Sequence, residues 1–184
     1  MQKCIPKIYC FINSFNKDYI SSLNKNIAII YRNYEDKINP SLILSIKNFC
    51  KKNNRKFYLS NNIKLSLKLD LDGVYLPSFN NDYKINIFQK KKKFLVLGSA
   101  HNIKEIREKE LQNVNAIFIS PIFKNQKSRY YLGINRTNLM TQLTQKKVIG
   151  LGGFNEKNII KIKLLNIYGI ASISLFKKKK YINF

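Results

Sequence analysis

Eight short apolar runs alternate with helix-length segments along this chain of 184 residues. Each run has the length of a β-strand, and its composition is typical of a strand buried on both faces of a parallel sheet. The expected strands are Lys7–Ile12, Ile27–Arg32, Lys56–Ser60, Gly73–Leu76, Phe94–Ser99, Ala116–Ser120, Lys147–Leu151 and Ile170–Ser174. This alternation predicts an α/β fold built from repeated βα units.

The number of units favours a closed (βα)8 TIM barrel over a doubly wound open sheet, which is the competing arrangement. Such a barrel usually needs about 200 residues or more, so we expect a compact version with some shortened helices. The most reduced helices are expected near residues 18–23 and after Ser174. The length suits one domain, residues 1–184.

Helical spacing of apolar residues is clearest in Pro40–Lys52, which opens with proline. A second helix is expected over Asn102–Lys109, with His101 or Asn102 as its cap. A third is expected over Asn155–Leu165, with Asn155 as its cap. In that helix the side chains expected to face inward are Ile159, Ile160, Ile162, Leu164 and Leu165.

The formal net charge of +24 has two explanations. A basic face could bind an anionic partner, including a nucleic acid. Alternatively, lysine, asparagine and isoleucine are abundant throughout, as in drift from an AT-rich genome, and lysines cluster only at Lys90–Lys93 and Lys177–Lys180. Because no aromatic-basic or zinc-knuckle motif accompanies the charge, nucleic acid is not the expected partner.

The beginning of the sequence lacks the apolar core of a signal peptide, and no window reaches the roughly 20 apolar residues of a membrane span. The three cysteines, Cys4, Cys10 and Cys50, have no metal-type spacing. We therefore expect a cytoplasmic protein without a membrane partner.

A glycine pair, Gly152-Gly153, ends the seventh apolar run directly before the segment at Asn155, and the eighth run closes with Ser172 and Ser174. A turn of this kind exposes backbone N–H groups at the start of a helix, a geometry suited to a phosphate. The alternative is a tight βα turn without a ligand, because glycine is the usual residue where φ is positive.

In a βα barrel the active site lies at the carboxyl ends of the strands. Here these ends are polar and poor in carboxylates. They are Arg32, Ser60–Asn62, Tyr75–Asn80, Ser99–His101, Ser120–Lys127, Gly152-Gly153 and Ser172–Ser174. They contain no paired-carboxylate site, no Cys–His nucleophile pair and no zinc cluster.

Several of these motifs together resemble the thiamine phosphate synthase/TenI family. They are Gly98-Ser99-Ala100-His101, Ile119-Ser120-Pro121-Ile122-Phe123, Leu132-Gly133, Ile149-Gly150-Leu151-Gly152-Gly153-Phe154-Asn155 and Gly169-Ile170-Ala171-Ser172-Ile173-Ser174. Asp72-Gly73-Val74-Tyr75-Leu76 resembles the fourth-strand motif, where Tyr75 replaces a common histidine, and Arg32 falls where the family has an arginine. The resemblance runs from about Lys7 to Phe176 and rests on the order and spacing of these motifs.

The resemblance implies a barrel enzyme that joins a hydroxymethylpyrimidine diphosphate to a thiazole phosphate, giving thiamine phosphate and pyrophosphate. Catalysis would be mostly positioning and neutralisation of the leaving group, with Mg²⁺ as the cofactor. The implied residues fall into three groups. They are Gly152, Gly153, Ile173 and Ser174 for the thiazole phosphate, Arg32, Ser99 and Lys127 (or Lys124) for catalysis, and Asn61, Asn62, Tyr75 and Asn80 for the pyrimidine diphosphate pocket.

The chain departs from the family where Mg²⁺ would bind. The third-strand Asn-Asp-Arg motif falls on Ser60-Asn61-Asn62 or, with a one-residue gap, reaches Ile63, and the acidic position after the fourth strand falls on Asn80. Both expected carboxylates are therefore amides, which hold Mg²⁺ weakly. Asp82 could substitute only if its loop shifts. The TenI-branch histidine is also absent, because Ser120-Pro121 stands there and His101 is the chain's one histidine.

Three functions are therefore compared: a thiamine phosphate synthase, a catalytically reduced member that binds a phosphorylated thiazole, and a basic RNA-associated protein. The expected partners are small phosphorylated molecules, with a second copy of the chain as a further candidate. Individual residues also have plainer explanations: Arg32 could pair with Glu35 or Asp36, His101 could cap a helix, and Tyr75 could be a packed aromatic residue.

Overall fold

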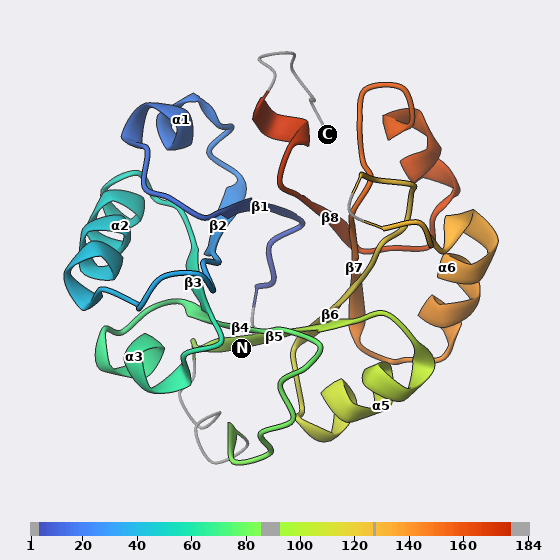
Figure 1. Cartoon of the computed structure of the whole chain (residues 1–184), viewed down its shortest axis with the longest axis horizontal. Coiled ribbons are helices and arrows are strands. Elements are labelled where there is room, and N and C mark those ends of the chain that lie inside the picture. Colours follow the sequence, from blue (N-terminus) through green and yellow to red (C-terminus); the bar gives the residue numbers. More distant parts are fainter. Residues whose placement is uncertain (1–3, 86–92, 127, 178–184) are drawn as a thin grey trace.

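The computed structural model describes residues 4–85, 93–126 and 128–177. Eight parallel strands close into a barrel in sequential order, and β8 pairs with β1 (Figure 1). The strands are β1 (Ile8–Ile12), β2 (Ile27–Tyr31), β3 (Phe57–Ser60), β4 (Gly73–Leu76), β5 (Leu95–Ala100), β6 (Ala116–Ile119), β7 (Lys147–Leu151) and β8 (Gly169–Ser172). The TIM-barrel prediction is confirmed, and the open sheet is excluded.

Helices surround the ring of strands (Figure 1). They are α1 (Lys17–Ser22), α2 (Pro40–Lys52), α3 (Ile63–Lys68), α5 (Ile103–Leu111), α6 (Gly133–Gln142) and the 3₁₀ helices η1 (Ile159–Leu164) and η2 (Leu175–Lys177). The expected shortening is confirmed in α1 and α3, which have six residues each, and in η2 after Ser174.

Local capping explains where the two best-defined helices begin. The side chain of Asn39 accepts from the N–H groups of Ser41 and Leu42, and Pro40 opens α2. Asn102, one of the two expected caps of α5, accepts from Glu105 N–H at 2.9 Å. Against the strands, α2 buries Ile43, Ile46 and Cys50, whereas α5 buries Ile106 and Lys109.

The segment 155–165 differs from the expected α-helix. The side chain of Asn155 accepts from Lys157 and Asn158 N–H and closes a local turn, so the helix begins at Ile159 and is 3₁₀. Three residues per turn align Ile159, Ile162 and Leu165 toward the barrel. The inward prediction for Ile160 and Leu164 is wrong: they are 69% and 60% exposed.

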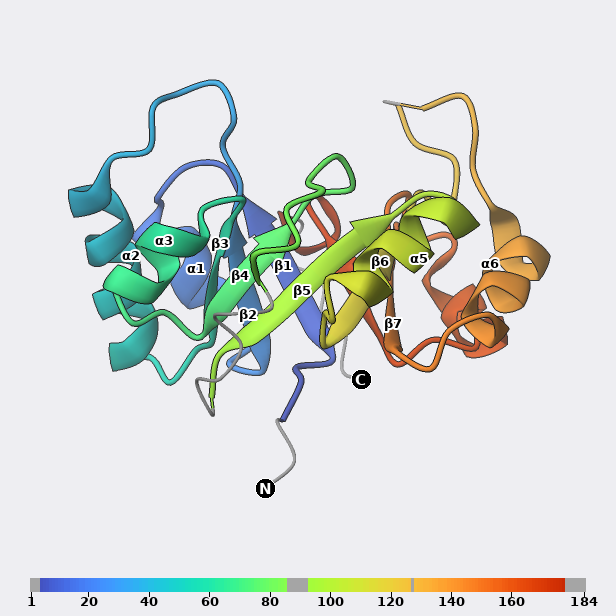
Figure 2. The same cartoon turned by 90° about the horizontal axis from the view of Figure 1, so that it is seen from below.

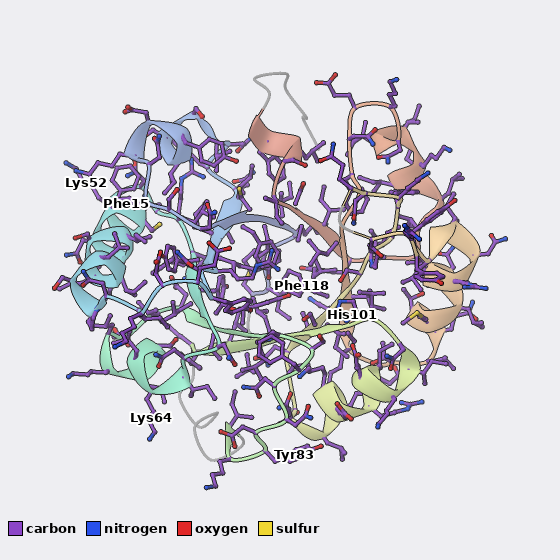
Figure 3. The ribbon with its side chains drawn as sticks, viewed as in Figure 1. Phe15, Lys52, Lys64, Tyr83, His101 and Phe118 are labelled. Carbon is purple, nitrogen blue, oxygen red and sulfur yellow. The ribbon has the colours of Figure 1, made fainter. Side chains whose placement is uncertain are left out.

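Aromatic rings fill the interior of the barrel. Phe118 lies in the middle of the ring of strands (Figure 3), with its ring centroid 5.0 Å from that of Tyr9 and 5.3 Å from that of Tyr75. Phe11 stands edge-on to Tyr75 at 5.1 Å. These side chains belong to one buried cluster with Tyr58 and small residues, so the barrel has a solid core.

The next interior-facing position along four strands is polar. Side chains alternate along a strand, so Arg32 follows Ile30, Ser60 follows Tyr58, Ser99 follows Leu97 and Ser120 follows Phe118 on the inward face. Figure 2 shows the loops after β2, β4 and β6 projecting from this same edge of the barrel. The architecture therefore places a polar layer over an aromatic floor, at the edge where the strands end.

Candidate active site at the carboxyl ends of the strands

Arg32, Tyr75 and Ser99 gather above the aromatic floor. The Arg32 guanidinium lies 4.7 Å from the centre of the Phe11 ring. Burial raises the pKa of the Tyr75 hydroxyl to about 12, and hydrogen bonds with Ser99 and Arg32 act in the opposite direction. Tyr75 is thus a neutral, packed aromatic residue whose hydroxyl meets two residues expected at the site.

The ion pair considered for Arg32 is replaced by this cation–π contact. The Asp36 carboxylate instead accepts from the Asn33 side chain at 2.9 Å. Because the guanidinium rests on a ring at the inner edge of the barrel, its charge is directed to the mouth of the barrel.

The glycine turn after β7 has the backbone geometry that its sequence predicts. Gly152 and Gly153 have φ values of +90° and +78°. A Cβ on Gly153 would lie 2.1 Å from the Phe123 carbonyl oxygen, so only glycine fits there. The turn's carbonyl groups accept from within the protein: Gly152 from Phe123 N–H, and Gly153 from the Asn158 side chain at 2.7 Å.

The chain after β8 lies beside this turn. Leu151 of β7 pairs with Ala171 of β8, so Gly152-Gly153 and Ile173-Ser174 extend from neighbouring strands at the same edge. Ile173 and Ser174 lie beyond the end of β8, contrary to the expected strand boundary, because the Ser172 hydroxyl accepts from Leu175 N–H and turns the chain. Both Ile173 and Ser174 are exposed to solvent.

Asn61 and Asn80, predicted for the pyrimidine diphosphate pocket, contact each other. The Asn80 side-chain nitrogen donates to Asn61 Oδ1 at 2.8 Å. Asn61 has a φ of +56°, and its N–H donates to the Tyr75 carbonyl at 2.8 Å, which fixes it to the end of β4. The two loops after β3 and β4 are thus joined at the rim.

Two buried residues, one in α5 and one directly after it, donate hydrogen bonds to Asn80. Lys109 Nζ donates to the Asn80 carbonyl at 2.6 Å and to Gln112 Oε1 at 2.9 Å. Gln112 Nε2 donates to Asn80 Oδ1 at 3.0 Å. Sequence reasoning missed both residues; the available signal was a lysine three positions after Ile106, on the apolar face of the expected helix.

The remaining predicted residues have different surroundings. Asn62 caps α3, with its side chain accepting from Leu65 N–H at 2.9 Å. Lys124 is exposed in the loop after β6, and Lys127 lies outside the described residues. His101 contacts the Glu105 side chain through its N–H and its ring, and it is not the cap of α5, which is Asn102.

The donor set at the rim does not suit Mg²⁺. Asn61 and Asn80 offer neutral amides, and the amide oxygen of each already accepts a hydrogen bond. Asp82 is exposed, and its Oδ1 accepts from Lys84 N–H at 2.9 Å. Within the described ranges, no three His, Cys, Asp or Glu side chains cluster in a way that could hold a metal ion.

A hollow lies at the opposite end of β3 from this rim and is lined by basic and acidic residues, among them Lys47, Arg55, Lys56 and Asp72. Arg55 donates to the Asn24 and Ile27 carbonyls, and Lys56 pairs with Asp72 at 2.7 Å. These charges serve internal contacts. Across the described parts of the chain, no helix is long and apolar enough to span a membrane.

Known proteins are similar to this chain in sequence and in fold. Thiamine-phosphate synthase 1 from Streptococcus pneumoniae is 27% identical over 146 residues, which cover 77% of this chain and 69% of that protein. Thiamine-phosphate synthase from Prochlorococcus marinus is 28% identical over 166 residues, 86% of this chain, which spans about half (47%) of that protein. Among solved structures, thiamine phosphate pyrophosphorylase from Pyrococcus furiosus has the same fold, with a TM-score of 0.74 at 15% identity, covering 95% of this chain and 92% of that one.

The family profile described as thiamine monophosphate synthase matches residues 23–176. This range contains the strand ends Arg32, Asn61, Asn80 and Ser99 and the glycine turn. Because the match extends over most of the sequence, the chain belongs to the thiamine monophosphate synthase family.

Proposed function

We propose that this protein condenses a hydroxymethylpyrimidine diphosphate with a thiazole phosphate to give thiamine phosphate and pyrophosphate. The observation that carries the proposal is the pairing of β7 with β8, which sets the glycine turn beside Ile173-Ser174 at the edge where Arg32 and Ser99 also lie. Two anionic groups are thereby given neighbouring positions on one rim. Family membership supports the same chemistry.

The thiazole phosphate would bind to main-chain N–H groups of Gly152, Gly153, Ile173 and Ser174. The carbonyl groups of the two glycines already accept hydrogen bonds, so the polarity of the turn suits an anion. Both glycines have positive φ, and Gly153 packs directly against the Phe123 carbonyl, so the turn is held in one conformation.

The diphosphate would lie against Arg32 and Ser99, with Asn61 and Asn80 at its outer side. The Arg32 guanidinium would neutralise charge on the leaving group, and the rings of Phe11 and Tyr75 would support the flat pyrimidine. Lys127, and Lys124 in the same loop, are further proposed contacts. A cytoplasmic setting is proposed from family membership.

Mg²⁺ is expected from the family, and Asn61 and Asn80 do not suit it. We therefore assign no step to the ion. Asp82 is the one carboxylate proposed for it, and it would have to turn away from Lys84 N–H.

A second candidate function, favoured by the Asn61–Asn80 contact, is binding of the thiazole phosphate without condensation. Calorimetric titration with the thiazole phosphate, followed by incubation with both precursors and MgCl2, separates the two. The enzyme binds and forms thiamine phosphate, whereas the reduced protein only binds. Absence of binding would contradict both.

A further inference from the structure

A chain of hydrogen bonds leads from Lys109 to the rim. A lysine ammonium has donors and no acceptor, so it must meet the oxygen of Gln112, at 2.9 Å. The nitrogen of Gln112 is then the atom that faces Asn80 Oδ1, at 3.0 Å. In turn, the nitrogen of Asn80 faces Asn61 Oδ1, at 2.8 Å.

Two fixed donors set the orientation of these amides: Lys109 sets that of Gln112, and the backbone N–H of Asp82, which donates to Asn80 Oδ1 at 3.1 Å, supports the same orientation of Asn80. An amide can usually be turned end for end, and its neighbours decide which end is which. Lys109 and Gln112 are both fully buried, so water does not compete for their hydrogen bonds. The stem of Lys109 packs over Gly98, where a Cβ would lie 2.9 Å from Lys109 Cδ.

The last amide in the chain is exposed to solvent. Asn61 Oδ1 accepts from Asn80, so the NH₂ group of Asn61 is the part of this amide that can donate to a ligand. A cation would need the oxygen there. An anion needs the N–H groups.

We propose that Lys109 and Gln112 are positioning residues that orient the Asn80 and Asn61 amides so that the rim binds an anionic phosphate group through N–H donors, without a divalent cation. This inference rests on the proposed function, because it assumes that the diphosphate lies at this rim. At this rim, N–H donors that are oriented by buried residues would take the place of the metal ion that the family implies.

The test is calorimetric titration of the full chain with pyrophosphate, in excess EDTA and in excess MgCl2. The wild type is expected to bind in EDTA, and MgCl2 is expected to weaken its binding, because Mg²⁺ complexes pyrophosphate and withdraws the free anion. Gln112→Glu keeps the size and the contact with Lys109 but sets a carboxylate against Asn80 Oδ1. It therefore favours the reversed amides, in which Asn61 presents its oxygen, over the orientation that the Asp82 N–H still supports. Its affinity in EDTA is expected to fall about tenfold, the effect of one hydrogen bond to a charged group, and MgCl2 is expected to restore part of it.

Gln142→Glu is the matched control, because it makes the same charge change at the exposed last residue of α6. Its affinity is expected to equal that of the wild type. Asn61→Asp changes only the last group in the chain and is expected to show the same dependence on MgCl2 as Gln112→Glu, which keeps the test valid if Gln112→Glu fails to fold.

Wild-type binding that requires MgCl2, no wild-type binding of pyrophosphate, or Asn61→Asp binding equally well in EDTA would each overturn the inference. The proposed function fails separately. If thiamine phosphate forms while pyrophosphate binding needs MgCl2, only the positioning role is lost. If binding in EDTA follows the expected pattern and no thiamine phosphate forms, only the enzymatic function is lost.

Discussion

The side-chain nitrogen of Asn80 lies 2.8 Å from Asn61 Oδ1, so two residues predicted for the pyrimidine diphosphate pocket bind each other. This contact joins the loops after β3 and β4 by a neutral hydrogen bond. Two carboxylates in the same places would repel each other unless a cation lay between them.

Replacing both amides, Asn61→Asp with Asn80→Asp, should therefore create a Mg²⁺ site. The double variant is expected to bind Mg²⁺ saturably in a calorimetric titration, because two charged oxygen ligands meet at the rim. The wild type is expected to show no saturable binding. Saturable wild-type binding that is lost in Asp82→Asn would instead assign the ion to Asp82.

Gly153→Ala should destabilise the protein more than Gly133→Ala. Both glycines have positive φ, +78° and +70°, so both substitutions strain the backbone. Only at Gly153 would the new Cβ lie against the Phe123 carbonyl, whereas nothing lies within 4 Å at Gly133. The free energy of unfolding in urea is expected to fall by about 2 kcal/mol more for Gly153→Ala. Equal losses of unfolding free energy in the two variants would mean that the turn at Gly153 can shift to make room for a Cβ.

Arg32→Gln should weaken pyrophosphate binding by roughly ten- to a hundredfold, because it removes the cation resting on Phe11. The melting temperature should change little, since a partly exposed cation–π contact contributes only about 0.5–1 kcal/mol. Arg136→Gln, on the exposed face of α6, removes the same charge elsewhere and should leave affinity unchanged. Equal effects in the two variants would show that only net charge matters.

The stability of the protein should depend on Lys109 at alkaline pH. Burial lowers the pKa of Lys109 to about 8, while Glu108 and Glu105 act to raise it. In the unfolded chain its pKa is about 10.4, so between these values the unfolded state binds more protons and the free energy of unfolding rises with pH. Urea unfolding of the wild type, relative to Lys109→Met, should show this gain between about pH 8 and about pH 10. A constant difference between the two proteins would contradict it.

The strand pattern was predictable because each strand of a closed barrel is buried on both faces and is therefore apolar throughout. The helix after β7 was not, because the choice between α and 3₁₀ depends on the turn that Asn155 forms with Lys157 and Asn158. Lys109 lies on the same helix face as Ile106, but this position alone did not predict its burial. A lysine on a helix is ordinarily exposed, and Lys109 is buried with its Nζ donating to the Asn80 carbonyl.

Condensation of the two precursors by the purified protein, followed by mass spectrometry of thiamine phosphate and compared with Gly153→Asp and Gly133→Asp, tests the proposed site most directly. We predict that the wild type and Gly133→Asp form the product and that Gly153→Asp does not, because a side chain at residue 153 would meet the Phe123 carbonyl and displace the turn. No product from the wild type, or undiminished product from Gly153→Asp, would contradict the proposed function.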